Sequence, residues 1–210
     1  MKDYYIYTEQ MTVGYGGKPL IRNINLHLRR GEILTLIGPN GSGKSTILKS
    51  IIQQLSLLGG AVYLDGRSMA RMSELEVAKR LSVLMTERIR PELMTCEDVV
   101  STGRYPYTGR LGILTAEDRR IVRESMALVH SEDLADCDFS EISDGQRQRI
   151  LLARALCQEP EVIVLDEPTS FLDIRHKLEL LSTLKDMVRQ RQLAVVRSLH
   201  ELDLAQQGAY

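Results

Sequence analysis

Apolar and polar side chains alternate along the first part of the chain. Residues 3–8 and 21–28 both follow this pattern, and Gly16 and Gly17 lie between the two segments. Alternation with a period of two is typical of strands with one buried face, and a glycine pair is typical of a turn. A continuous apolar run follows at residues 33–37. We therefore expect residues 3–37 to form strands, with an antiparallel β region at the N-terminus.

Strands and helices alternate farther along the chain. The spacing of apolar residues predicts helices over residues 44–54, 73–80 and 174–191, and strands over residues 61–66, 81–86, 161–166 and 193–199. The segment 161–166 is almost continuously apolar, as expected of a strand that is buried on both faces of a parallel sheet. This alternation predicts an α/β fold with a mostly parallel sheet.

Residues 87–158 follow a different pattern, in which helices alternate with loops. Thr95 and Thr115 each precede an aspartate by three residues, and this spacing caps the first turn of a helix. A third helix is expected over residues 143–157. We therefore predict a single domain over residues 1–210. Its core is formed by residues 1–86 and 159–210, and residues 87–158 form an inserted helical subdomain.

Residues 38–46 fit the phosphate-loop pattern G-x-x-x-x-G-K-[ST] at every fixed position. A predicted strand precedes them and a predicted helix follows, which indicates a P-loop NTPase core. Glycines let backbone N–H groups point at phosphate oxygens, and the helix adds its positive N-terminal end. Lys44 is expected to neutralise phosphate charge, and Ser45 is expected to bind Mg²⁺. The predicted nucleotide-binding residues of this loop are Gly38, Asn40, Gly41, Ser42, Gly43, Lys44, Ser45 and Thr46.

Two carboxylates stand at the end of the predicted strand 161–166. A site for a Mg²⁺–nucleotide complex needs an acid at a strand end to hold the metal or a metal-bound water, and Asp166 fits that role. Glu167 is one residue farther on, where it is expected to polarise the attacking water. The alternative is an ordinary acidic first turn of a helix. The phosphate loop upstream favours the metal site.

A second candidate phosphate-binding helix begins near Ser143. Ser143 offers a hydroxyl, Gly145 lets N–H groups approach an anion, and Gln146 follows. An ordinary helix cap is the alternative for such a short segment. Residues 142–149 resemble the signature motif of ABC (ATP-binding cassette) ATPases, and they lie in that family's order between the phosphate loop and the Asp-Glu strand.

Three further residues gain a role from this resemblance. Residues 168–173 look like the D-loop of the family, with Asp173 at its acidic position. Residues 198–201 look like the H-switch, so the resemblance implies that His200 contacts the γ-phosphate and assists Glu167. Tyr15 lies where family members carry an aromatic side chain that stacks on adenine, although a surface tyrosine in a turn is the alternative.

The resemblance covers the whole chain. It is nearest to the ATPase subunits of importers for iron–siderophore complexes, haem, vitamin B12 and related metal chelates, on the basis of residues 101–107, Asp144 and residues 198–203. It implies a homodimer whose composite sites each bind ATP and Mg²⁺ between two head-to-tail copies. It also implies a membrane permease as partner, an indirect link to an extracytoplasmic binding protein, and a peripheral location on the cytoplasmic face of the membrane.

The sequence departs from the family pattern in three places. Thr86 stands where the family has a glutamine that contacts Mg²⁺, and its shorter side chain favours contact through a bridging water. Arg197 interrupts an apolar run, so we expect it to reach solvent or to pair with a carboxylate. The chain ends at Tyr210, where family members continue. We therefore expect a truncated C-terminal end, lower stability and weak ATP hydrolysis.

Composition narrows the functional classes. With 27 basic and 28 acidic residues, the net charge of −1 gives no electrostatic reason to expect nucleic-acid binding. The three cysteines lack metal or redox spacing, which favours a reduced cytosolic compartment. The alternatives are a non-hydrolysing nucleotide sensor and a soluble ABC protein that acts on DNA or ribosomes. Proteins of the second kind usually carry two cassettes, long coiled coils or zinc modules, and none is visible in the sequence.

Overall fold

A parallel sheet lies at the centre of the protein. The computed structural model describes residues 4–85, 91, 93–169 and 174–199. Strands β4 (Ile33–Ile37), β9 (Ala194–Leu199), β8 (Val162–Leu165) and β7 (Leu81–Leu84) pair side by side in that order, and every pair is parallel. The four residues of β8 are fully buried, as its continuous apolar run predicted. The predicted α/β class and parallel sheet are confirmed.

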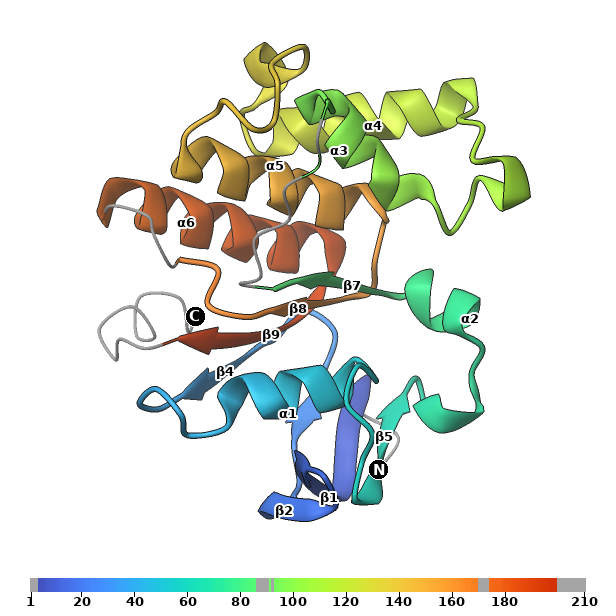
Figure 1. The fold of residues 1–210 in the computed structure, drawn as a ribbon, viewed down its shortest axis with the longest axis vertical. Helices are drawn as coiled ribbons and strands as arrows, with labels where there is room; N and C mark the ends of the chain where they lie inside the picture. The colour runs from blue at the N-terminus through green and yellow to red at the C-terminus, as the bar shows by residue number, and fades with distance from the viewer. Residues whose placement is uncertain (1–3, 86–90, 92, 170–173, 200–210) are drawn as a thin grey trace.

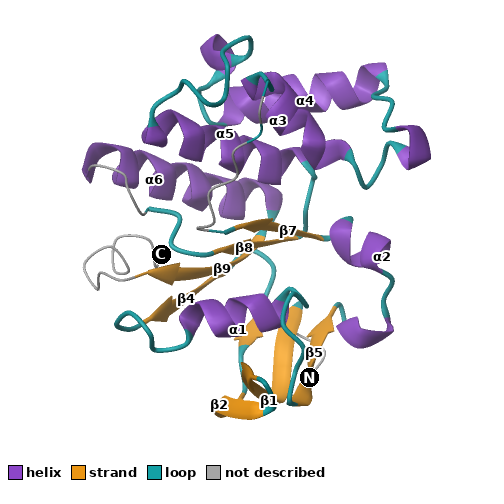
Figure 2. Ribbon diagram, viewed as in Figure 1, coloured by secondary structure: helices purple, strands orange, loops and turns teal. Residues whose placement is uncertain are grey.

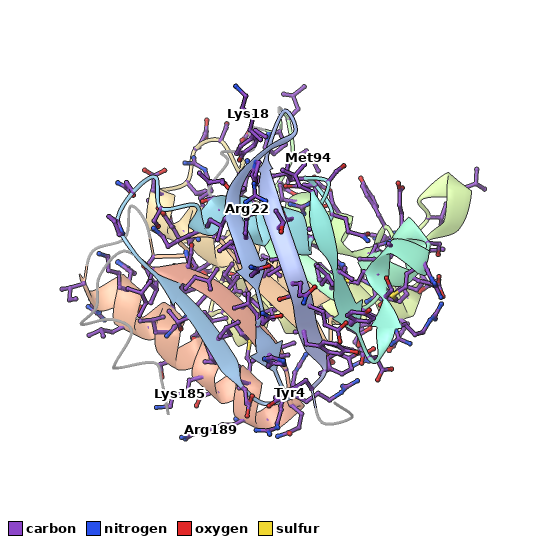
Figure 3. The ribbon with its side chains drawn as sticks, turned by 90° about the horizontal axis from the view of Figure 1, so that it is seen from below. Tyr4, Lys18, Arg22, Met94, Lys185 and Arg189 are labelled. Atoms are coloured by element: carbon purple, nitrogen blue, oxygen red, sulfur yellow. The ribbon has the colours of Figure 1, made fainter. Side chains whose placement is uncertain are left out.

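A second, antiparallel sheet is built from the N-terminal segment. Strand β1 (Ile6–Tyr15) pairs with β2 (Lys18–Ile24), with β3 (His27–Leu28) and with β5 (Gly59–Leu64), which in turn pairs with β6 (Arg67–Ser68). The turn between β1 and β2 is formed by Gly16 and Gly17, as expected. Lys18 and Arg22 lie on edge strand β2 (Figure 3), where exposed cations oppose pairing with another sheet.

Helices cover both faces of the parallel sheet. Helix α1 (Lys44–Ile51) lies on one side, and α3 (Cys96–Ser101), α4 (Ala116–Leu128), α5 (Asp144–Cys157) and α6 (Ile174–Arg191) lie on the other (Figures 1 and 2). The short helix α2 (Glu74–Ala78) precedes β7. Two apolar cores result. In one, α1 and the antiparallel sheet pack against one face of the parallel sheet. In the other, helices α3, α4, α5 and α6 pack against the opposite face of the parallel sheet.

Helix starts agree with the capping pattern in the sequence. Thr95 and Thr115 each accept a hydrogen bond from the backbone N–H of the aspartate three residues later, and that aspartate bonds back to the threonine N–H. Ser73 and Ser143 form the same reciprocal arrangement with Glu76 and Gln146. The predicted division of the chain into a core and an inserted subdomain stays a prediction.

The expectation for Arg197 was wrong. Its side chain is 1% exposed, so it does not reach solvent. Its Nε donates to the Thr35 hydroxyl at 2.9 Å, while Nη1 and Nη2 have no hydrogen-bond partner, and no carboxylate of the described residues pairs with it. Burial lowers the pKa of this guanidinium. The reason is topological, because β9 lies between β4 and β8 and its side chains are covered on both faces of the sheet.

Candidate nucleotide-binding and hydrolysis site

The phosphate loop joins the end of β4 to the start of α1. Gly41 and Gly43 adopt the left-handed backbone conformation, with φ of 76° and 92°, which glycine adopts without steric strain. A Cβ on Gly43 would also lie 2.7 Å from Ile21 Cδ1, so the Ile21 side chain would have to move to admit it. Asn40, Gly41 and Ser42 are exposed at the tip of the loop. The predicted loop residues therefore lie together in one turn.

The N-terminus of α1 is the exception among the five α-helices whose N-caps are described. Helices α2, α3, α4 and α5 each begin with a reciprocal side-chain cap. Helix α1 begins at Gly43, which has no side chain to cap it, and its first turn holds no acidic residue. Its backbone N–H groups and its positive end are therefore not neutralised by a cap of the helix itself. This arrangement suits a bound phosphate.

Lys44 points back into the phosphate loop. The side chain is 7% exposed, and Nζ donates hydrogen bonds to the carbonyl oxygens of Gly38 at 2.7 Å and Pro39 at 3.0 Å. The ammonium therefore lies inside the curve of the backbone, next to the N–H groups that start α1. A cation held at this place adds to the positive potential of the helix end.

Ser45 and Asp166 meet at the same end of the parallel sheet. Ser45 Oγ donates to Asp166 Oδ1 at 3.1 Å, and the Asp166 side chain is buried with 5% exposed. Ser45 comes from the first turn of α1, and Asp166 directly follows β8. The sequence predicted that both residues bind Mg²⁺, and in the structure their side chains are in contact.

Ser198 is a third member of this cluster, and sequence reasoning missed its role. Its hydroxyl donates to Asp166 Oδ1 at 2.7 Å and accepts the backbone N–H of Glu167 at 2.9 Å. The side chain is fully buried on β9. The resemblance drew attention only to the histidine two residues later. A polar residue near the end of a buried apolar strand was the available signal.

Tyr15 lies beside the phosphate-loop helix. Its hydroxyl is 3.3 Å from the Thr46 hydroxyl, and the residue is 56% exposed. An aromatic side chain held at one end and open to solvent can stack against a planar ring. Tyr15 therefore lies next to the phosphate loop, in contact with its last residue, Thr46.

The signature residues do not join the phosphate loop within one chain. Ser143 and Gln146 cap α5 reciprocally, and the Asp144 carboxylate pairs with Arg147 at 2.6 Å. Gly145 lines a cavity of about 420 Å³ between α5 and α6. Helix α5 packs in the core on the opposite side of the parallel sheet from α1 (Figure 1). The α5 side chain of Gln148 does reach the loop after β8, where it donates to the Pro168 carbonyl oxygen at 2.8 Å.

Comparison with known proteins identifies the fold family. The family model for ABC transporters matches residues 21–170, which span both the phosphate loop and the signature segment. The chain belongs to the ABC transporter family. It is 48% identical over 198 residues to the uncharacterized ABC transporter ATP-binding protein MJ0873 of Methanocaldococcus jannaschii, covering 94% of this chain and 68% of that protein. It is 38% identical to the iron(3+)-hydroxamate import ATP-binding protein FhuC of Bacillus subtilis, covering 94% and 74%.

Solved structures agree with this ABC assignment. The fold matches a metal-chelate type ABC transporter with a TM-score of 0.86 and 26% identity, covering all of this chain and 77% of that one. It also matches the dimeric ATP-binding cassette MJ0796 bound to ADP and phosphate, with a TM-score of 0.82, 26% identity, and coverage of 97% and 91%. The ABC ATPase that the sequence predicted, with a P-loop NTPase core, is confirmed. The chain is an ATP-binding ATPase of this family.

The donor set of this ABC cassette fits Mg²⁺. The described residues contain no group of three or more His, Cys, Asp or Glu side chains that would form a complete protein cage for a metal. Mg²⁺ is usually held by one or two protein oxygens, with waters and substrate phosphates filling its other positions. The hydroxyl of Ser45 and the carboxylate of Asp166, in contact beside the phosphate loop, supply such oxygens.

Three predicted site residues of the cassette lie outside the described residues, namely Thr86, Asp173 and His200. Their roles stay predictions. Among the helices that the structure describes, none is both long and apolar enough to span a bilayer.

Proposed function

We propose that this chain is the ATP-hydrolysing subunit of an ABC importer that takes up an iron–siderophore complex, haem, cobalamin or a similar metal chelate. The proposed ATP hydrolysis is supported above all by the contact between Ser45 and Asp166 beside the phosphate loop. The import part is supported by relatives named for iron(3+)-hydroxamate, achromobactin and ferric enterobactin transport, at 38%, 39% and 35% identity.

In this proposal each residue of the cluster has one task. The loop N–H groups and Lys44 bind the phosphates, and Tyr15 stacks on the adenine. Ser45 and Asp166 would hold Mg²⁺, which would supply positive charge beside the phosphate oxygens. Glu167 orients the attacking water and accepts its proton, and His200 contacts the γ-phosphate. Thr86 contacts the metal through a water.

Two copies of the chain complete the site. In one chain α1, which begins in the phosphate loop, and the signature helix α5 pack on opposite faces of the parallel sheet. A head-to-tail partner therefore supplies its own Ser143, Gly145 and Gln146, together with Asp173, to the second face of the nucleotide. The predicted homodimer follows from this division, and the dimeric cassette MJ0796 bound to ADP and phosphate supports it.

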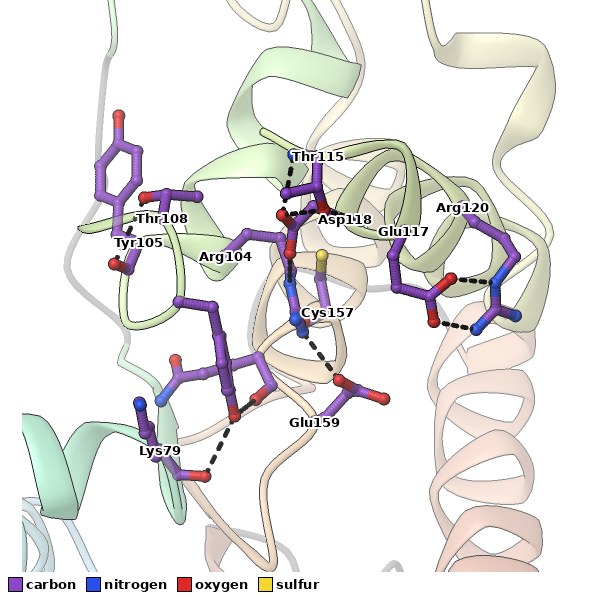
Figure 4. A network of polar contacts seen from close by, with 12 residues as sticks. Lys79, Arg104, Tyr105, Thr108, Thr115, Glu117, Asp118, Arg120, Cys157 and Glu159 are labelled. Atoms are coloured by element: carbon purple, nitrogen blue, oxygen red, sulfur yellow. Dashed lines mark hydrogen bonds and ion pairs between the residues drawn. The ribbon is translucent and has the colours of Figure 1, made fainter. Parts of the chain in front are cut away.

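Exposed apolar side chains between residues 93 and 113 suit contact with a membrane permease. Tyr105, Leu111 and Ile113 are exposed by 63%, 83% and 66%, and Leu93 by 95%. Behind them the buried Arg104 ties this segment to the rest of the protein. Its Nε pairs with Asp118 at 2.9 Å, and its Nη1 donates to the Cys157 carbonyl oxygen and to Glu159 (Figure 4). Apolar side chains on a firmly anchored segment suit docking to a partner.

Tyr107 extends this anchor toward the core. The guanidinium carbon of Arg104 lies 4.1 Å from the centre of the Tyr107 ring. The Tyr107 hydroxyl lies within donating distance of the carbonyl oxygens of Lys79 at 3.3 Å and Gln158 at 3.0 Å. Movement of the docking segment would thus reach both β7 and α5. Through the permease the cassette sits on the cytoplasmic face of the membrane, with the extracytoplasmic binding protein as an indirect partner and with no nucleic acid.

The test is Mg²⁺-dependent ATPase activity of the purified chain, compared with Lys44→Ala. We expect Lys44→Ala to lose ATP binding or turnover, because the ammonium that Gly38 and Pro39 hold inside the loop would be lost. Undiminished activity would refute the role of the phosphate loop. ATP binding by the unmodified chain without hydrolysis would favour a nucleotide sensor instead. Purification of the chain from membranes together with a permease of the metal-chelate class tests the import part.

A further inference from the structure

The Ser198 hydroxyl both donates and accepts a hydrogen bond at this site. A serine hydroxyl has one donor and two acceptor lone pairs. Its donor goes to Asp166 Oδ1 at 2.7 Å, and one lone pair accepts the N–H of Glu167 at 2.9 Å. The residue is fully buried, so water does not compete for these bonds. One side chain on β9 therefore contacts both residues that follow β8.

The contact with Asp166 sets the direction of the carboxylate. Oδ1 accepts two hydroxyl hydrogen bonds, from Ser45 at 3.1 Å and from Ser198 at 2.7 Å. Two donors on one oxygen restrict rotation of the carboxyl group. Ligands of metal ions need such outer contacts, because a carboxylate that turns freely loses part of its affinity for the ion.

The contact with Glu167 sets a backbone conformation. Glu167 has a φ of 50°, in the left-handed region that residues with a Cβ seldom adopt. Such a conformation persists only where the surroundings hold it. The hydrogen bond from the Glu167 N–H to Ser198 Oγ is a direct restraint on that peptide unit. Because φ determines where Cβ points, the same hydrogen bond fixes the direction in which the Glu167 side chain leaves the backbone.

We infer that Ser198 is a positioning residue for ATP hydrolysis: its hydroxyl holds the Asp166 carboxylate for Mg²⁺ and the Glu167 backbone for water activation at the same time. The inference rests on the proposed roles of Asp166 and Glu167. It links the metal-binding and water-activating steps through one hydroxyl. It also places that link on β9, two residues before His200 in the sequence.

Ser82 provides a matched control. It lies on β7 of the same parallel sheet, is 1% exposed, and its hydroxyl has no hydrogen-bond partner among the described residues. Ser82→Ala therefore removes a buried hydroxyl from the sheet without touching Asp166 or Glu167. Any effect that Ser198→Ala shares with Ser82→Ala is therefore caused by the loss of a buried hydroxyl from the sheet and not by the lost contacts with Asp166 and Glu167.

The experiment compares the unmodified chain with Ser198→Ala, Ser198→Cys and Ser82→Ala. ATP affinity is measured with Mg²⁺ and with a chelator, and kcat is measured at saturating Mg²⁺–ATP. Mg²⁺ should raise the ATP affinity of the unmodified chain. In Ser198→Ala and Ser198→Cys, we expect this increase in ATP affinity to be roughly 10–100-fold smaller, as when outer contacts of a metal ligand are lost. We expect kcat to fall by a similar factor. Affinity in chelator should not change. Ser82→Ala should match the unmodified chain.

Normal Mg²⁺ dependence and kcat in both Ser198 variants would overturn the inference. If Ser198→Ala fails to fold, Ser198→Cys decides, because it has nearly the same size but is a poor hydrogen-bond donor. Asp166→Asn and Glu167→Gln are measured in the same assay. If these two are inactive while the Ser198 variants are normal, only the role of Ser198 fails. If these two are active, the proposed assignment of the site itself fails.

Discussion

Ser45 and Asp166 are 121 positions apart in the chain, yet their side chains meet through a hydrogen bond of 3.1 Å. Ser45 belongs to the phosphate loop that follows β4, and Asp166 follows β8. These two strands run in the same direction with β9 between them, so their carboxyl ends lie at one edge of the sheet. Ligand sites of open α/β sheets form at that edge.

Glu167→Gln is expected to retain ATP binding and ATP-dependent dimerisation and to hydrolyse ATP at under roughly 1% of the normal rate. The neutral amide keeps the shape of the side chain but is a poor base for the attacking water. Phosphate release and size-exclusion chromatography with ATP measure the two properties. Glu132→Gln, at an exposed carboxylate on another surface, is the control. Near-normal turnover in Glu167→Gln would reassign the base.

Tyr15→Ala should weaken ATP binding about tenfold or more, because stacking of a base on an aromatic side chain contributes about 1–3 kcal/mol. Tyr15→Phe should bind almost normally, since the ring is kept and only the 3.3 Å contact with the Thr46 hydroxyl is lost. Titration with a fluorescent ATP analogue measures both. An equal loss in the two variants would show that the hydroxyl contact matters rather than the ring.

Arg197→Leu should stabilise the fold by about 1–3 kcal/mol, the usual range for a buried polar group without partners. The guanidinium is 1% exposed, and Nη1 and Nη2 have no hydrogen-bond partner within the part of the chain that the structure describes. The midpoint of urea unfolding is the measurement. Arg189→Leu, at an exposed position on α6, is the control and should leave the midpoint unchanged. A lower midpoint for Arg197→Leu would contradict the prediction.

Asp118→Asn should destabilise the protein near neutral pH by about 3 kcal/mol, because it removes the buried one of the two carboxylates that pair with the buried Arg104 and leaves only the more exposed Glu159. Hydrogen bonds from Thr115, together with Arg104, hold the pKa of Asp118 below its usual value, although burial opposes this shift. A lowered pKa stabilises the fold at pH values above the unfolded pKa of about 4, and this stabilisation is lost as pH falls.

The stability difference between the unmodified chain and Asp118→Asn should therefore be full at pH 7 and shrink below about pH 4. Chemical unfolding at a series of pH values measures it. Asp133→Asn, at an exposed carboxylate of the same helical region, should show no comparable trend. A difference that stays constant down to pH 3 would mean that the charge of Asp118 contributes nothing.

Much of the local structure was accessible from the sequence. The helix starts at Thr95, Thr115 and Ser143 were predicted to the residue, because a cap depends only on side chains three positions apart. The expected helix over residues 174–191 has the bounds of α6. Residues near strand ends were less well predicted. The strand expected at residues 3–8 begins at Ile6 and continues to Tyr15.

Contacts between segments that are distant in the chain could be predicted from the sequence only in part. The phosphate loop and the Asp-Glu strand end were predicted as members of one site from their residue types. The hydrogen bonds of Ser198 and the burial of Arg197 were not, although both residues are adjacent on β9. Apolar spacing marks a buried strand, but it does not say which neighbouring strand each residue faces.

By itself, the sequence determined that a phosphate loop opens a helix after a buried strand, because that pattern depends on glycines and charges within nine residues. Only the tertiary structure decided which carboxylate and which hydroxyls surround Ser45. That outcome depends on the order of strands in the sheet, with β9 inserted between β4 and β8. Strand order follows from packing of the two apolar cores, in which residues more than a hundred positions apart are buried together.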